Sequence, residues 1–115
     1  MLDSGISVLF LYENFAVAAV VLRRLLDLPM VHVVRSECVA ACHSSYDVVI
    51  VDPYLREHRR AEVLRRWAGP VGAPTPIIEL RDLGGGAGAA VVAGPPDSDA
   101  AQAVLSALQL DLAAA

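Results

Sequence analysis

The chain has 115 residues, of which 56% are hydrophobic and 19% charged, and its formal net charge is −4. That length predicts a single domain over residues 1–115, and the negative charge argues against direct binding to nucleic acid. No apolar run approaches the roughly 20 residues that a membrane helix needs, so no membrane partner is expected. Two cysteines without a signal-like start indicate a reducing, cytoplasmic setting.

Short apolar runs alternate with helix-like segments along the chain. The composition of these runs predicts strands over residues 6–11, 30–34, 46–52, 75–80 and 89–93. Helices are predicted over residues 14–28, 36–43, 57–68 and 98–110, with Asn14 and Ser36 suited to cap the first two. Strands alternating with helices at this spacing predict an α/β fold with a mostly parallel sheet covered on both faces.

The connection between the fourth and fifth predicted strands breaks this pattern. Residues 81–88 contain four glycines, which make a poor helix. Either an extended crossover replaces a helix here, or the fifth strand runs antiparallel to its neighbour. The sequence leaves both open, and we favour the crossover.

Asp52 is the most informative residue, because it ends a buried β-branched run. A carboxylate at the carboxyl end of a parallel strand lies at the edge where open α/β sheets bind ligands and carry out chemistry. The chain contains no lysine, since all nine basic residues are arginines, so chemistry that needs a lysine ammonium is excluded.

The element order and these polar positions resemble the receiver domain of two-component response regulators, a flavodoxin-like (CheY-like) fold. The resemblance covers nearly the whole chain and implies a doubly wound, five-stranded sheet of order 2-1-3-4-5, with the helix between strands 4 and 5 reduced to a Gly-rich loop. Asp52 matches the phosphoacceptor, Glu13 the second acid, and Tyr12 replaces the first acid. Arg81 stands at the switch Ser/Thr position, and Gly94-Pro95 replaces Lys-Pro.

These replacements predict a degenerate member, or pseudo-receiver. The resemblance implies a non-enzymatic domain in bacterial signal transduction or transcriptional control, acting through a signalling or effector protein and independently of phosphorylation. An effector domain can follow residue 115 in such proteins. Glu13 and Asp52 predict at most weak Mg²⁺ binding. Arg81 beside Asp52 is predicted to pair with it and lock one state, unless Arg81 simply projects into solvent.

Two other functions stay open. A phosphorylatable receiver would accept phosphate on Asp52 from a histidine kinase. A small-ligand-binding regulatory domain would use the carboxyl edge near Tyr12, Asp52 and Arg81.

The first and last predicted helices are apolar beyond what one buried face requires, which predicts a homodimer interface. Its alternative is an Ala-rich sequence in which alanine is merely a good helix former. Five arginines surround the third helix and predict a solvated face, or a docking site for an acidic partner. The predicted interface residues are Val17, Val20, Val21, Val104, Leu105 and Leu108.

Overall fold

A computed structural model describes residues 6–25, 30–41, 46–67, 75–82, 88–93, 99–108 and 110–112. The strands are β1 (Ser7–Tyr12), β2 (Met30–Arg35), β3 (Val48–Val51), β4 (Ile77–Asp82), β5 (Gly88–Ala93) and β6 (Leu110–Leu112). The helices are α1 (Phe15–Arg24), the 3₁₀ helix η1 (Ser36–Ala41), α2 (Glu57–Trp67) and α3 (Asp99–Leu108). None of the helices within these ranges is long and apolar enough to cross a membrane.

The strands form one sheet in the order β2-β1-β3-β4-β5-β6. Strands β1 to β4 are mutually parallel where they pair, β5 is antiparallel to β4, and β6 is parallel to β5. The predicted α/β class, mostly parallel sheet and order 2-1-3-4-5 of the first five strands are therefore confirmed. This order is compatible with a flavodoxin-like fold.

The direction of β5 corrects the crossover that the sequence favoured. Strand β4 extends to Asp82 and β5 begins at Gly88, so only residues 83–87 separate them. Five residues are enough for a hairpin loop but too short for the usual parallel crossover of a dozen or more. The antiparallel ladder is irregular between Leu80 and Asp82, which leaves Arg81 at a β-bulge.

The end of the chain also differs from the prediction. The last helix was expected to reach residue 110, but α3 ends at Leu108 and Leu110 already belongs to β6. Strands β5 and β6 are parallel and are linked through α3, so this part of the chain is a strand-helix-strand crossover. The predicted helix over residues 36–43 is the shorter 3₁₀ helix η1.

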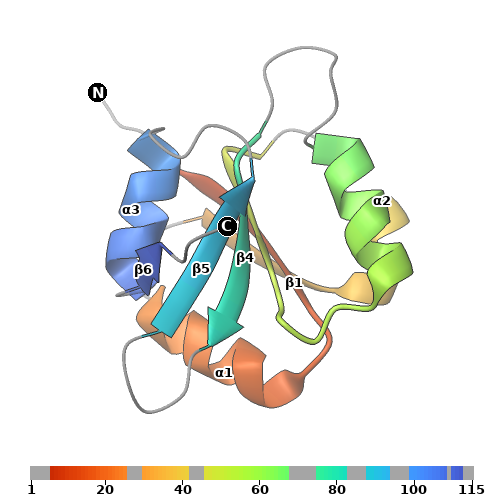
Figure 1. Cartoon of the computed structure of the whole chain (residues 1–115), viewed down its shortest axis with the longest axis horizontal. Helices are drawn as coiled ribbons and strands as arrows, with labels where there is room; N and C mark the ends of the chain where they lie inside the picture. Colours follow the sequence, from red (N-terminus) through yellow and green to blue (C-terminus); the bar gives the residue numbers. More distant parts are fainter. Residues whose placement is uncertain are drawn as a thin grey trace.

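Two apolar clusters cover the two faces of the sheet, as the period-2 alternation of strands requires. Helices α1 and α3 pack on one face, and α2 packs on the other (Figure 1). In β1, Val8 and Phe10 face the α1/α3 side, whereas Leu9 and Leu11 face the α2 side. The chain leaving β1 therefore goes to one face, and the chain leaving the adjacent β3 goes to the other.

Four of the six predicted interface residues belong to this core, which corrects their prediction as surface residues. Val21, Val104 and Leu108 are fully buried and Leu105 is 6% exposed. Helix α3 exposes only a narrow stripe that includes Asp99, Gln102 and Ser106, because it contacts the sheet face, α1 and β6. The α1/α3 contact is closed by Arg24, which donates from Nη1 to the Leu108 carbonyl at 2.8 Å.

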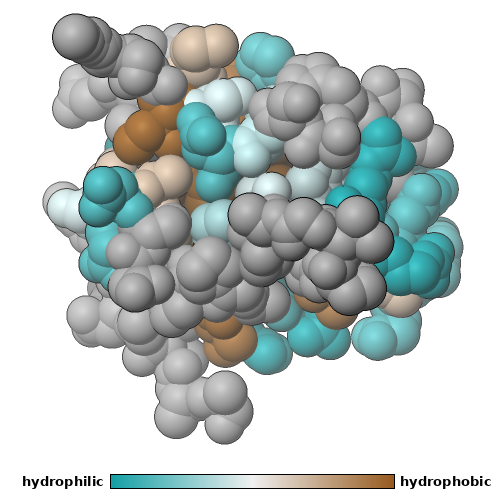
Figure 2. Space-filling model, turned by 90° about the horizontal axis from the view of Figure 1, so that it is seen from above, coloured by the Kyte–Doolittle hydropathy of each residue, from teal (hydrophilic) through white to brown (hydrophobic). Residues whose placement is uncertain are grey.

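Helix α1 retains part of the predicted apolar surface. Val17 is half-buried against the core, and Val20 is 37% exposed. Phe15 and Leu22 are also exposed on this helix. Helix α2, in contrast, is mostly polar. Hydrophilic residues gather on the right of Figure 2, the side on which α2 lies in Figure 1.

Candidate functional site

Asp52 follows β3 directly and begins the turn toward α2. The segment Asp52-Pro53-Tyr54-Leu55 has the residues that a β-turn favours, with Asp first and Pro second. The Leu55 N–H donates to the Asp52 carbonyl at 3.1 Å, which closes the turn. The Tyr54 N–H donates to Asp52 Oδ1 at 2.7 Å, so the side chain reinforces the same turn.

The other carboxylate oxygen of Asp52 reaches across to the loop after β1. Oδ2 accepts hydrogen bonds from the N–H groups of Glu13 at 2.9 Å and Asn14 at 2.8 Å. Asp52 is only 2% exposed, so these three backbone donors replace water around its charge. The carboxylate thus fastens the β1–α1 loop to the β3–α2 loop.

Asn14 extends this connection into α1. It is the predicted cap, and its Oδ1 accepts hydrogen bonds from the N–H groups of Ala16 at 2.8 Å and Val17 at 3.3 Å. Two of the donors that the first turn leaves unpaired are satisfied in this way. Because Asp52 holds the backbone of the capping residue, it also fixes where α1 begins.

Glu13 and Tyr12 have surroundings different from those of Asp52. The Glu13 carboxylate accepts a hydrogen bond from the hydroxyl of Ser36, at the start of η1. Tyr12 is half-buried, with its ring 6.2 Å from Phe10 and 6.3 Å from Phe15 between centroids. Glu13 lines one cavity and Asp52 another, and each carboxylate has its own hydrogen-bond donors.

The cavity that Asp52 lines, which we name the Asp52 cavity, has a volume of about 250 Å³. Arg81 lines it and is exposed, but no ion pair of the described residues joins Arg81 to Asp52. The predicted lock between these two side chains is therefore not formed. The lining of the Asp52 cavity includes Asp52, Leu55, Glu57, Arg60, Glu79 and Arg81.

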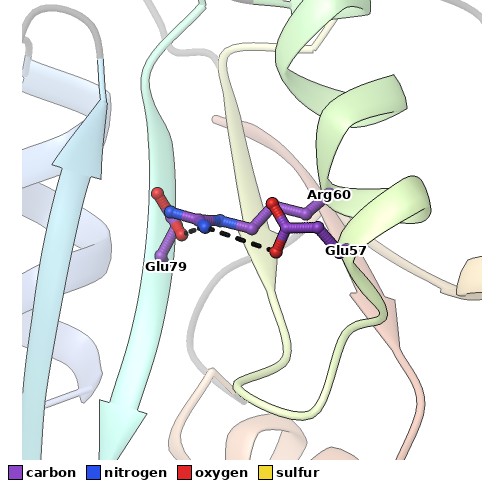
Figure 3. Close-up of polar contacts among 3 residues, drawn as sticks. All are labelled: Glu57, Arg60 and Glu79. Carbon is purple, nitrogen blue, oxygen red and sulfur yellow. Dashed lines mark hydrogen bonds and ion pairs between the residues drawn. The ribbon is translucent and has the colours of Figure 1, made fainter.

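A charged triad that the sequence did not predict stands in the same cavity. Arg60 Nε donates to Glu79 Oε1 at 2.6 Å, and Arg60 Nη1 lies 3.9 Å from Glu57 Oε2 (Figure 3). The hydrogen bond to Glu79, followed by the charge of Glu79, raises the pKa of Arg60. Glu79 is buried on the α2 side of β4, beside Ile78 and Leu80, which face the opposite side. The sequence signal that could have indicated this triad is a glutamate, Glu79, at a position of β4 that faces the core.

The second cavity, of about 180 Å³, lies at the carboxyl ends of β1 and β2. It is bounded by the start of α2 and by η1, and we name it the switch-point cavity because the chain leaves β1 and β3 toward opposite faces there. Its main lining residues are Tyr12, Glu13, Arg35, Arg56, His58 and Arg59.

Gly94 and Pro95 lie outside the described residues. The described end of β5, Ala93, pairs with Ile77 at the amino end of β4. Asp52 follows the carboxyl end of β3, which is parallel to β4. The antiparallel direction of β5 therefore carries the chain away from Asp52 just before the positions that match the Lys-Pro pair of receivers.

Across the described residues, no group of three or more His, Cys, Asp or Glu side chains is arranged to hold a metal ion. Comparisons with protein-family models, with curated proteins and with solved structures give no significant match.

Proposed function

We propose that the chain is an atypical, receiver-like signalling domain of flavodoxin-like fold that acts through protein contacts without phosphorylation of Asp52. The observation that carries the proposal is the engagement of the Asp52 carboxylate by the N–H groups of Glu13, Asn14 and Tyr54. The first five strands have the order that such a fold requires, and the aspartate follows the third strand.

Phosphorylation of an aspartate requires one carboxylate oxygen to attack phosphorus while cations neutralise the developing charge. At Asp52, attack through Oδ2 would disturb two backbone hydrogen bonds, and attack through Oδ1 would disturb the turn at Tyr54. The side chain is also 2% exposed, which leaves little access for a phosphodonor. These features support a structural carboxylate that keeps the receiver shape.

In this proposal the domain conveys information through a protein contact. Among the described residues, the large apolar side chains exposed on α1 are Phe15, Val20 and Leu22. The homodimer stays a prediction, and it depends on this helix because the predicted residues of α3 are buried. Light scattering over a range of concentrations measures the oligomeric state, and Val20→Glu should shift any dimer toward monomer.

Phosphorylation is tested by incubating the chain with Mg²⁺ and acetyl phosphate and measuring the intact mass. We expect no added phosphoryl group, while a phosphorylatable receiver treated in parallel gains one. A phosphoryl group that appears on the chain and is absent from Asp52→Asn would refute the proposal and establish the phosphorylatable alternative.

A further inference from the structure

The switch-point cavity lies where an open α/β sheet offers a crevice. Strand β1 continues toward α1 on one face, whereas β3 continues toward α2 on the other, although the two strands are neighbours. Loops that diverge in this way leave room at the carboxyl edge, and ligands of such sheets bind there. Here Asp52 sets the separation of the two loops, because it binds the backbone of both.

Three guanidinium groups reach this crevice from different elements. Arg35 ends β2, Arg56 directly precedes α2, and Arg59 lies in the first turn of α2. Among the ion pairs of the described residues, none includes Arg56, and Arg59 is 3.6 Å from Glu62. Arg35 pairs with Glu37 through Nε at 2.8 Å, and a guanidinium has further donors on its two Nη atoms.

Two carboxylates oppose these cations. Glu13 is hydrogen-bonded by Ser36, and Glu37 is bound by Arg35, so each has its own neutral or cationic donor. The three arginines outnumber the two glutamates in the lining, and His58 and the Tyr12 hydroxyl add further polar groups. An anion entering the cavity therefore meets a surplus of donors on one side, formed by α2.

We propose that the switch-point cavity binds a small, phosphate-bearing anion through Arg56 and Arg59, with Arg35 closing the opposite side. Guanidinium groups bind phosphate oxygens bidentately, which favours arginine at such sites. The volume of about 180 Å³ is below the roughly 300 Å³ at which pockets for larger organic ligands begin, and the lining is mostly polar. A compact, highly charged ligand fits this cavity better than an aromatic one.

The site goes beyond the proposed function and does not rest on it, since Asp52 is not among the lining residues of this cavity. Isothermal titration calorimetry with inorganic pyrophosphate at fixed ionic strength tests it directly. We expect saturable binding to the unaltered chain. Loss of a charge-assisted contact in Arg56→Gln or Arg59→Gln should weaken the apparent affinity about tenfold.

The matched control is Arg65→Gln, which removes the same charge from an exposed position of α2 outside the cavity. It should leave the affinity within about twofold, because salt screens a charge at that distance. Equal weakening in Arg65→Gln and Arg56→Gln would show general charge attraction and overturn the site. So would the absence of saturable heat, whereas malonate binding as tightly as pyrophosphate would overturn the phosphate assignment.

Discussion

The two cavities at the carboxyl edge differ in how their charges are compensated. In the Asp52 cavity, Asp52 is bound by three backbone N–H groups and Arg60 lies between Glu79 and Glu57. In the switch-point cavity, Arg56 takes part in none of the described ion pairs, and the pair that involves Arg35 is exposed to solvent. Asp52 and Arg60 therefore join elements in the Asp52 cavity, whereas Arg35 and Arg56 are exposed to solvent in the switch-point cavity.

The difference suggests a rule for interpreting this edge. A charge whose partners are fixed and buried contributes to the fold, and changing it should lower the free energy of unfolding. A charge with solvent-exposed or distant partners contributes little to stability and is available to a ligand. Stability measurements on single variants can therefore separate the two cavities before any ligand is known.

The largest effect is expected for Asp52→Ala. Removing the carboxylate leaves three backbone N–H groups without their acceptor and frees both loops, so we expect a loss of roughly 3 kcal/mol in the free energy of unfolding. Urea denaturation followed by circular dichroism measures this. Asp52→Asn retains one acceptor oxygen and should lose about half as much. A loss below about 1 kcal/mol in Asp52→Ala would mean that Asp52 does not fasten the loops.

A smaller loss is expected for Glu79→Ala. This change removes the buried partner of Arg60 at 2.6 Å, and Arg60 can recover part of the cost by turning to solvent, so we expect about 1.5 kcal/mol. The matched control is Glu62→Ala, which breaks a looser pair at 3.6 Å to Arg59 and should cost below about 0.5 kcal/mol. Equal losses in both variants would remove the distinction between fixed and loose pairs.

The contribution of Arg60 should also be independent of pH near neutrality. Its pKa is raised above the ordinary value for arginine, first by the hydrogen bond to Glu79 and then by the charge of Glu79. A base with a raised pKa in the folded state stabilises fully below its unfolded pKa and loses that contribution only as pH rises through the folded value. The difference in unfolding free energy between the unaltered chain and Glu79→Ala should therefore stay constant from about pH 6 to 9.

Asn14→Ala should lower the free energy of unfolding by about 1 kcal/mol in the same urea series. The first turn of α1 loses an oxygen that accepts hydrogen bonds from two N–H groups. Asn14→Ser keeps an acceptor at the cap and should restore most of the stability. The backbone bond from Asn14 to Asp52 is unchanged in both variants, so the experiment isolates the cap. If Asn14→Ser were as unstable as Asn14→Ala, the cap would not be what stabilises this turn.

Local patterns predicted the elements of this fold better than its long-range pairings. Alternating apolar runs predicted the first five strands, and Asn14 was correctly expected to cap a helix. The direction of β5 could not be settled, because a hairpin and an extended crossover both suit a Gly-rich segment. The burial of Leu105 and Leu108 was missed, since a neighbouring helix and a sixth strand cover α3 from the side.

The site was predictable in position but not in its contacts. Asp52 was correctly expected to follow the third strand, yet the sequence suggested Arg81 and Mg²⁺ as its partners. The observed partners are backbone N–H groups, and every residue type except proline supplies these, so no sequence pattern reveals them. The partner of Arg60 was likewise hidden, because Glu79 is 19 residues away in another element.

The smallest effect on stability is expected for Arg56→Gln, which tests the switch-point cavity as the variants above test the Asp52 cavity. Arg56 is exposed and takes part in none of the ion pairs of the described residues, so the free energy of unfolding should change by less than about 0.5 kcal/mol. The same urea series measures it beside Glu79→Ala. A loss as large as that of Glu79→Ala would place Arg56 among the charges that join elements. Arg56 would then resemble Arg60, and the contrast between these two arginines of the two cavities would disappear.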